Sequence, residues 1–305
     1  MIFLVTGGRG FIGSHFVDLV LKNGHKVIDI DTMTYAASKN LPWDNNPNYE
    51  HLKLDICTID HIPVCDIIVN FAAESHVDNS IESPNVFMKS NAYGVFNILN
   101  LLRAKVYKKP KFIHVSTDEV YGDINEGEKN ELSILNPSNP YSATKAAAEM
   151  LIFSYARTFN IDYQIVRSTN NYGPRQYPEK LIPKIIHSLD TNQKIPIHGD
   201  GSYVRDWLYV GDNVEAIYKV CYADKLNEIW NISAYNYMTN MDIVKSVCGW
   251  KKIDDYISHV EFIDNRLGQD YRYSISSEKI RKELKWQPKN NTLFNFIGDT
   301  NASEQ

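Results

Sequence analysis

Two adjacent carboxylates, Asp118 and Glu119, stand directly after a hydroxyl side chain, Thr117. The apolar run 112–115 before them predicts a buried strand, and open α/β sheets bind their ligands where parallel strands end. Two acids at such a place can serve as a proton donor and a proton acceptor, which suits an elimination better than a plain oxidation. From these residues alone, a strand-end turn with two solvated acids is the alternative.

A glycine-rich turn, Gly7-Gly8-Arg9-Gly10-Phe11-Ile12-Gly13, follows a short apolar run and precedes a helical pattern. Such a turn brings backbone N–H groups and a helix N-terminus against a pyrophosphate, where any Cβ would block the approach. Asp31 ends the next strand-like run, and its carboxylate can accept from both hydroxyls of an adenosine ribose. We therefore expect a dinucleotide site that takes NAD rather than NADP.

Two further strand ends are candidates for this site. Asp55 and Ile56 end an apolar stretch and could border the adenine. Phe71-Ala72-Ala73 supplies small residues where a cofactor must pass close to the backbone. A simple strand-to-loop turn is the alternative for both.

Tyr141 and Lys145 begin a helical pattern that Asn139-Pro140 introduces, and their spacing places them on one helical face. An ammonium beside a phenol stabilises phenolate, so we expect Lys145 to lower the pKa of Tyr141 and make it a base near neutral pH. The same ammonium can hold a ribose hydroxyl. An exposed helical face is the usual interpretation of such a pair, but the glycine-rich turn strengthens the chemical one.

The elements that must position these residues alternate along the first half of the chain. Strand patterns occur at 2–5, 26–30, 67–71, 112–115 and 163–167, and helical patterns at 11–23, 94–104 and 141–159. This alternation predicts a Rossmann-type, doubly wound parallel sheet with helices on both faces. The strand ends, with their polar side chains, would then meet at one edge of the sheet.

The second half is less regular and is interrupted by prolines. It predicts a smaller, interleaved C-terminal lobe on the carboxyl side of the sheet. We assign residues 1–169 to the dinucleotide-binding domain, with 206–223 returning to it, and residues 170–205 and 224–305 to the smaller lobe. The polar residues 290–305 should fray.

The composition is that of an ordinary soluble globular protein, with 43% hydrophobic and 23% charged residues. A net charge of −5 without a basic stripe argues against a nucleic-acid partner. Four scattered cysteines without a Cys-x-x-Cys pair favour free thiols and no metal site. The N-terminal apolar run is too short for a signal peptide and no window approaches a membrane span, so we expect a cytoplasmic protein without a membrane partner.

Together the motifs resemble the extended short-chain dehydrogenase/reductase family and, within it, the nucleotide-sugar 4,6-dehydratases, most of all those that act on dTDP-glucose. The resemblance runs from Leu4 to about Pro288. The acid pair after the strand-end threonine separates this group from the related epimerases. Besides the segments above, the motifs are Asp31-Thr32-Met33-Thr34-Tyr35, Ala72-Ala73-Glu74-Ser75-His76-Val77-Asp78, Asn170-Asn171-Tyr172-Gly173-Pro174, Pro178-Glu179-Lys180-Leu181-Ile182-Pro183 and Arg205-Asp206-Trp207.

The resemblance implies conversion of dTDP-glucose to dTDP-4-keto-6-deoxyglucose in deoxysugar biosynthesis, such as a rhamnose pathway. Tyr141, assisted by Thr117 and Lys145, would take the C4 hydroxyl proton while hydride moves to NAD⁺. Glu119 would then take the C5 proton, and Asp118 would protonate the departing C6 hydroxyl. The hydride would return to C6, so NAD would stay tightly bound and be restored in each turnover.

The resemblance also implies the binding residues. NAD would contact Gly7, Gly10, Phe11, Ile12, Gly13, Asp31, Thr32, Thr34, Asp55, Ile56, Phe71, Ala72, Ala73, Ser75, Ser90, Asn171, Tyr141 and Lys145. The nucleotide-diphosphate hexose would contact His76, Thr117, Asn170, Lys180, Leu181, Pro196, His198, Arg205, Asn240 and Arg266. Cations among them suit a pyrophosphate, and helices near 94–104 and 142–159 would form a four-helix homodimer contact.

Some features depart from the family pattern. The family commonly has Asp-Arg-Pro-Gly-His-Asp where this chain has Asn265-Arg266-Leu267-Gly268-Gln269-Asp270, and the asparagine also occurs in UDP-glucose 4,6-dehydratases. The choice between dTDP and UDP, and between glucose and an N-acetylated hexose, therefore stays open. An NAD-dependent sugar-nucleotide epimerase and an inactive NAD-binding regulatory protein are further alternatives.

Overall fold

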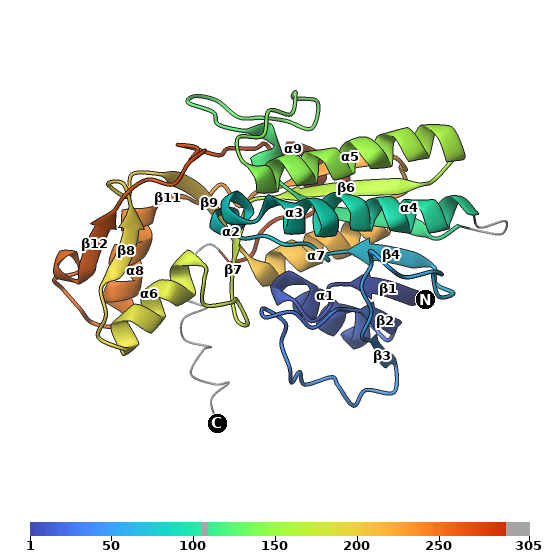
Figure 1. Ribbon diagram of the computed structural model, residues 1–305, viewed down its shortest axis with the longest axis horizontal. Coiled ribbons are helices and arrows are strands. Elements are labelled where there is room, and N and C mark those ends of the chain that lie inside the picture. Colours follow the sequence, from blue (N-terminus) through green and yellow to red (C-terminus); the bar gives the residue numbers. More distant parts are fainter. Residues whose placement is uncertain (105–108, 291–305) are drawn as a thin grey trace.

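A seven-stranded sheet forms the centre of the computed structural model, which describes residues 1–104 and 109–290 (Figure 1). Its order is β10-β6-β5-β4-β1-β2-β3, and each neighbouring pair is parallel. This confirms the predicted Rossmann-type fold. The strands are β1 (Ile2–Thr6), β2 (Lys26–Ile30), β3 (Tyr49–Leu52), β4 (Ile67–Asn70), β5 (Lys111–Thr117), β6 (Tyr163–Ser168) and β10 (Glu228–Ile232).

Helices cover both faces of this sheet. On one face α1 (Phe11–Lys22) and α7 (Val210–Cys221) bury apolar side chains in a core with β1 and β4. On the other face α4 (Gly94–Ala104) and α5 (Pro140–Phe159) form a second core with β5 and β6. Burial on both faces explains why the strands read as nearly continuous apolar runs.

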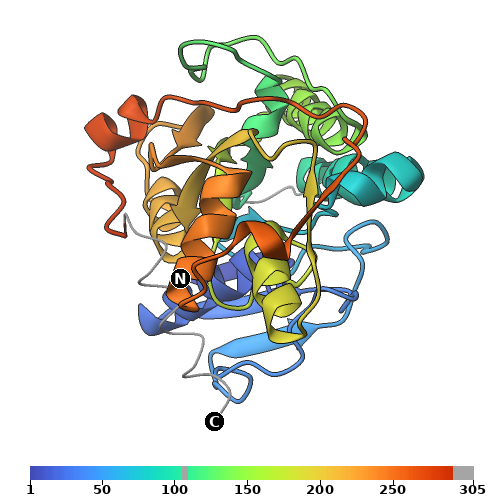
Figure 2. The same ribbon diagram turned by 90° about the vertical axis from the view of Figure 1, so that its left-hand side faces the viewer.

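The smaller lobe extends from the carboxyl edge of the sheet. It holds a three-stranded sheet of β7 (Asn170–Tyr172), β9 (Val204–Tyr209) and β11 (Tyr237–Thr239), and a parallel pair of β8 (Ile195–His198) and β12 (Val260–Ile263). The helices α6 (Leu181–Asp190) and α8 (Asn240–Trp250) pack together in its core (Figure 2).

Short elements surround the edge where the two parts meet. Three short helical elements precede α4, and a 3-10 turn continues β5. Their bounds are α2 (Val77–Glu82), α3 (Pro84–Phe87), the π-helical turn η1 (Met88–Tyr93) and η2 (Asp118–Tyr121); η3 (Ile257–His259) and α9 (Glu278–Glu283) lie further along.

The structure differs from the prediction in the end of one strand and in the elements that join the large domain. β5 runs to Thr117, beyond the predicted end at residue 115, because Ser116 and Thr117 continue the pairing with β6. α7 returns to the large domain and packs beside α1, but β10 and α9 join that domain as well, through Trp230 and Ile280 in its core. The predicted fraying concerns residues 291–305 almost entirely, which lie outside the described residues.

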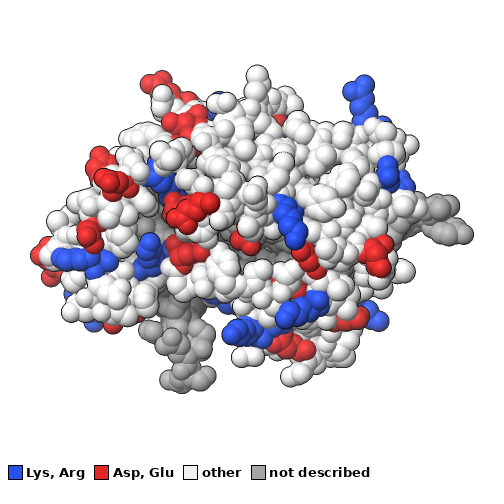
Figure 3. All heavy atoms as spheres, viewed as in Figure 1, with Lys and Arg blue, Asp and Glu red and all other residues white. Residues whose placement is uncertain are grey.

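Charged side chains are mixed in sign on the face shown in Figure 3, where lysines and arginines are scattered among acids. The four cysteines form no disulfide bond with one another. Within residues 1–104 and 109–290, no group of His, Cys, Asp and Glu could hold a metal ion. No helix in these ranges is long and apolar enough to cross a membrane.

Candidate functional site

The glycine-rich turn between β1 and α1 leaves a backbone cradle. Gly7 has φ +73°, and a Cβ there would stand 2.7 Å from the backbone nitrogen of Ala72 at the end of β4. A Cβ on Gly13 would collide with the Gly7 carbonyl oxygen. The α1 N-terminus has no side-chain cap, so its N–H groups are available to an anion. The turn thus fits the pyrophosphate of a dinucleotide.

Asp31 follows β2 beside this turn. Its Oδ2 accepts from the Arg9 N–H at 3.0 Å and its Oδ1 from the Met33 N–H at 2.7 Å, which fixes the carboxylate at the strand end. Behind it, Asp29 accepts from the Gly8 N–H and from the Tyr49 hydroxyl. Burial raises the pKa of Asp29 to about 7. Asp29 is thus tied to the turn and to Tyr49, and Asp31 is the acid that stands at the strand end, where the ribose is predicted.

The other residues predicted to bind NAD differ in their exposure. Thr32 and Thr34 are exposed after β2, Phe71 to Ala73 follow β4, Ser90 lies in η1 and Asn171 in β7. Asp55 accepts from the Cys57 N–H. The Ile56 side chain is buried in the core against Gly94. Only the backbone of Ile56 is thus placed to meet a cofactor.

The predicted catalytic residues come together at the end of β5. Thr117 ends the strand, Asp118 and Glu119 follow in η2, and Tyr141 and Lys145 lie on the first turns of α5. The Thr117 hydroxyl donates to Asp118 Oδ1 at 3.2 Å and accepts from the Glu119 N–H at 3.3 Å. Lys145 donates to the Val115 carbonyl oxygen at 2.7 Å, which anchors α5 to β5.

A capping box starts α5 at the required point. Asn139 Oδ1 accepts from the Ser142 N–H at 2.9 Å, while the Ser142 hydroxyl oxygen accepts from the Asn139 N–H at 3.3 Å. Pro140 occupies the first turn, where its missing N–H costs nothing. Asn139 Nδ2 also donates to Glu119 Oε2 at 3.3 Å. One residue therefore begins the helix of Tyr141 and Lys145 and contacts the acid pair.

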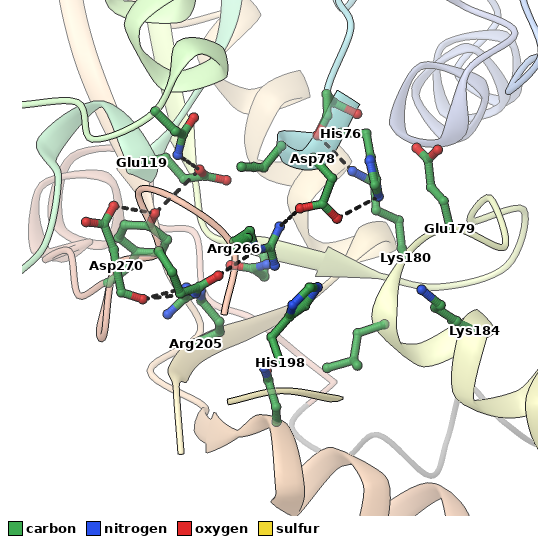
Figure 4. Close-up of a pocket in the computed structure, with 18 of the residues that line it drawn as sticks. His76, Asp78, Glu119, Glu179, Lys180, Lys184, His198, Arg205, Arg266 and Asp270 are labelled. Carbon is green, nitrogen blue, oxygen red and sulfur yellow. Dashed lines mark hydrogen bonds and ion pairs between the residues drawn. The ribbon is translucent and has the colours of Figure 1, made fainter. Parts of the chain in front are cut away.

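A cavity opens beside Glu119, between the sheet edge and the smaller lobe (Figure 4). Of the residues predicted to bind substrate, Thr117 does not line it. The other nine do: His76, Asn170, Lys180, Leu181, Pro196, His198, Arg205, Asn240 and Arg266. Ser75 and Asn171, predicted to bind NAD, also line the wall.

Several of these side chains already have protein partners. Lys180 donates to the Ser75 carbonyl oxygen at 2.8 Å, across the two parts of the chain. Arg266 lies 3.3 Å from Asp78 Oδ1. His76 caps α2 through Nδ1, which accepts from the Asn79 N–H, so a structural role accompanies its place on the wall. The cavity is thus preformed, and its wall carries four cations, Lys180, Lys184, Arg205 and Arg266, beside four acids.

The wall also holds residues that sequence reasoning missed. Asp78 belongs to a quoted motif and Asn139 is a recognisable helix cap, so both carried a usable signal. Others come from the smaller lobe: Gln176, Glu179, Gln269, Asp270 and Tyr273 in loops, Lys184 in α6 and Trp207 in β9. Glu179, Trp207, Gln269 and Asp270 belong to quoted segments, whereas no local pattern at Gln176, Lys184 or Tyr273 indicates proximity to the β5 end.

Comparison with known proteins identifies the family. A family model described as GDP-mannose 4,6 dehydratase matches residues 4–294. The dTDP-glucose 4,6-dehydratase of Haemophilus influenzae is 39% identical over 317 residues, which cover 94% of this chain and 93% of that protein. The chain belongs to the nucleotide-sugar 4,6-dehydratases of the extended short-chain dehydrogenase/reductase family.

Two other similarities agree with this family. The low-salt glycan biosynthesis protein Agl12 of Haloferax volcanii is 41% identical over 296 residues, 94% of each chain. DesIV, a dTDP-glucose 4,6-dehydratase from Streptomyces venezuelae solved with NAD bound, matches with a TM-score of 0.93 at 36% identity. That match covers 98% of this chain and 95% of the other, so the dehydratase fold extends over nearly the whole chain.

The two adjacent acids of the candidate site differ in what shifts their pKa values. Burial raises the pKa of Asp118 well above its ordinary value, and the neighbouring Glu119 charge adds to the effect. Burial also raises the pKa of Glu119, although the Arg205 charge opposes it. Asp118 Oδ2 is buried without a hydrogen-bond partner, which favours the protonated, neutral acid.

The predicted direction of the tyrosine shift is wrong for the protein alone. Burial and the charges of Glu119 and Asp118 raise the pKa of Tyr141, and the Thr117 hydroxyl lowers it only in part. Burial lowers the pKa of Lys145 to about 8, although the Glu149 charge raises it. Folding brings Glu119 and Asp118 to the phenol, and their charges, together with burial, outweigh the lowering effect predicted for Lys145.

Proposed function

We propose that this protein is an NAD-dependent dTDP-glucose 4,6-dehydratase that forms dTDP-4-keto-6-deoxyglucose. The observation that carries the proposal is that buried Asp118 and Tyr141 and part-buried Glu119 meet at one strand end, beside a cavity lined by Lys180, Arg205 and Arg266. Redox chemistry alone needs the tyrosine and a cofactor. The two acids Asp118 and Glu119, whose pKa values are raised, are not needed for redox chemistry and fit the removal of water.

In the redox step, Tyr141 would take the proton of the C4 hydroxyl. Thr117 supports it, since its hydroxyl lowers the pKa of Tyr141. A protonated Asp118 supports it as well, because a neutral acid removes one of the two charges that oppose ionisation of the phenol. Bound NAD supplies the hydride acceptor in this step and the hydride donor in the last one.

In the elimination, Glu119 would remove the proton at C5, which the neighbouring ketone makes acidic. Asp118 would give its proton to the hydroxyl that leaves C6. Two adjacent acids need unequal environments for these roles, and here Asp118 is 2% exposed while Glu119 reaches the cavity. Glu119 would finally return the proton to C5.

The adenosine half of the cofactor fits the first βα unit. The backbone cradle at Gly7 and the uncapped α1 N-terminus suit a pyrophosphate, and Asp31 suits a ribose diol. A 2′-phosphate would meet the Asp31 carboxylate, which favours NAD over NADP. Lys145 lies one turn after Tyr141 on α5, where its ammonium can hold the nicotinamide ribose.

The cavity suits a nucleotide-diphosphate hexose. Lys180, Arg266 and Arg205 supply positive charge for a pyrophosphate, and Pro196 in β8 supplies an apolar wall for a base. Tyr203 donates to Asn265 Oδ1 at 2.7 Å, and neither residue lines the cavity. The wall thus offers no group that would tell thymine from uracil by their shared carbonyls, so UDP-glucose is the second candidate.

Product mass after incubation with dTDP-glucose or UDP-glucose tests the proposal. The expected result is loss of one water, faster with dTDP-glucose. An isomer of unchanged mass would establish the epimerase alternative, and faster water loss from UDP-glucose would reassign the base. No turnover of either sugar nucleotide would overturn the proposed activity.

The assembly and location are part of the same proposal. We infer a homodimer through α4 and α5, which lie side by side in Figure 1. Tyr93, at the end of η1 just before α4, and Met150 of α5 are about half exposed. A monomer by light scattering would contradict this contact. Four cysteines without a disulfide suit the reducing cytoplasm, and cell fractionation would test that location.

A further inference from the structure

Two buried side chains on the cavity wall, Asp270 and Tyr273, have no part in the mechanism above. They are 5% and 4% exposed and line the cavity beside Glu119. The Tyr273 hydroxyl lies 2.6 Å from Asp270 Oδ2 and 3.5 Å from Glu119 Oε2. It therefore stands between two carboxyl groups, as the dashed lines from Glu119 and Asp270 show (Figure 4).

A phenol carries a single proton, which decides what each neighbour can receive. The 2.6 Å separation from Asp270 is typical of a hydroxyl that donates to a carboxylate, so the proton lies on that side. Glu119 then faces the lone pairs of the Tyr273 oxygen. An ionised Glu119 gains nothing from them, whereas a protonated Glu119 can donate to them after a slight approach.

Arg205 keeps the tyrosine in this place. Its guanidinium lies over the Tyr273 ring, 4.3 Å from the ring centre. The same group donates to the carbonyl oxygens of Asp270, at 2.9 Å, and Tyr271, at 3.1 Å. One cation thus holds the ring and the backbone of the residue whose carboxylate orients its hydroxyl.

We propose that Tyr273, oriented by Asp270, is a positioning residue for Glu119, whose carboxyl donates to the Tyr273 oxygen once it has taken the C5 proton of the hexose. The substrate in this statement rests on the proposed function, while the contact belongs to the protein alone. The electron pair of the C5–H bond becomes the C5–C6 double bond, and the C6 hydroxyl leaves with the Asp118 proton. The C5 proton stays on Glu119 until it returns to C5.

The amide and the cations around Glu119 act in the opposite sense. Asn139 donates to its Oε2 at 3.3 Å, which favours the ionised form. The cations that face it from the smaller lobe, Arg205, Lys180 and Arg266, lower its pKa, while burial raises it. Asp118 and Tyr141 face it from η2 and α5. Tyr273 supplies a hydrogen-bond acceptor for the proton-bearing state.

The first test uses Tyr273→Phe in the holoenzyme with C5-deuterated dTDP-glucose. We expect C4 oxidation at the normal rate, a decay of NADH absorbance about tenfold slower, and a larger deuterium isotope effect on that decay. Tyr237→Phe is the matched control, because Tyr237 also has a hydroxyl partner, Ser274, and an arginine, Arg272, over its ring. A merely structural role would leave the isotope effect unchanged and would overturn the proposal.

The second test needs no substrate. In protein labelled at the glutamate carboxyl carbons, the NMR signal of Glu119 is identified by its loss in Glu119→Gln, and its pKa is read by titration. We expect Tyr273→Phe to lower that pKa by roughly one, and Asp270→Asn to lower it less. An unmoved Glu119 pKa in both variants sinks the role of Tyr273. Failure of the unaltered protein to dehydrate dTDP-glucose would instead overturn the proposed function. The titration would still decide whether Tyr273 contacts the protonated Glu119.

Discussion

At the scale of single residues, Asp118 and Glu119 have different surroundings although they are adjacent in sequence. Asp118 is enclosed, with one carboxyl oxygen lacking a partner, and is suited to hold a proton. Glu119 reaches the cavity and contacts Asn139. Burial raises the pKa of both, and the neighbouring Glu119 charge raises that of Asp118 further. This asymmetry suits the proposed roles, in which Asp118 donates a proton and Glu119 accepts one.

Glu119→Gln should therefore stop the reaction between its two halves. The amide cannot take the C5 proton, whereas Tyr141 and Lys145 remain intact for C4 oxidation. We expect NADH to accumulate and water release to fall about a hundredfold or more, as for loss of a general base. Rapid mixing with absorbance and product mass measures both. Normal dehydration by this variant would refute the role given to Glu119.

Lys145 gives the site an alkaline limit. Its ammonium is charged only below a pKa of about 8, against 10.5 in the unfolded chain. Activity should therefore fall as the pH rises through about 8. The unfolded chain keeps the proton up to 10.5, so stability should rise with pH between these values. Lys145→Arg should move the activity limit upward, and an unmoved limit would assign it to another group.

At the scale of elements, the strong periodic patterns predicted where the chemistry lies. The turn after β1, the end of β5 and the start of α5 each carry local signals: glycines, an apolar run and a helix cap. The short β7, β8 and β12 strands carry little periodicity, so the wall that they build was known only through resemblance. Asp270 and Tyr273 reach Glu119 by tertiary packing that no local pattern encodes.

The cap of α5 is the element whose contribution can be isolated. Asn139→Ala should lower the free energy of unfolding by about 1 kcal/mol, because the Ser142 N–H loses its acceptor. Asn139→Asp keeps the cap, so its stability should stay near that of the unaltered protein. That variant places a second carboxylate against Glu119 and should raise its pKa. Urea unfolding compares the two, and equal stabilities would show that the cap is dispensable.

At the scale of the whole molecule, the site exists only where the two parts of the chain meet. The large domain supplies the cradle, the acids and the tyrosine, and the smaller lobe supplies the cations. Lys180 joins them, since it begins α6 and donates to the Ser75 carbonyl oxygen beyond β4. Tyr35, after β2, also reaches Glu179 at 3.2 Å. Sugar-nucleotide binding and closure of this boundary should therefore be coupled.

Lys180→Met tests that coupling. It removes a cation and the bond between the two parts, so KM for the sugar nucleotide should rise about tenfold or more with little change in kcat. Lys184→Met is the matched control, because Lys184 lies one turn later on α6 and lines the same cavity but is exposed. Steady-state kinetics of both variants measures the difference. If the two raised KM equally, charge alone would explain the effect, and the Lys180 contact with Ser75 would have no separate part in binding.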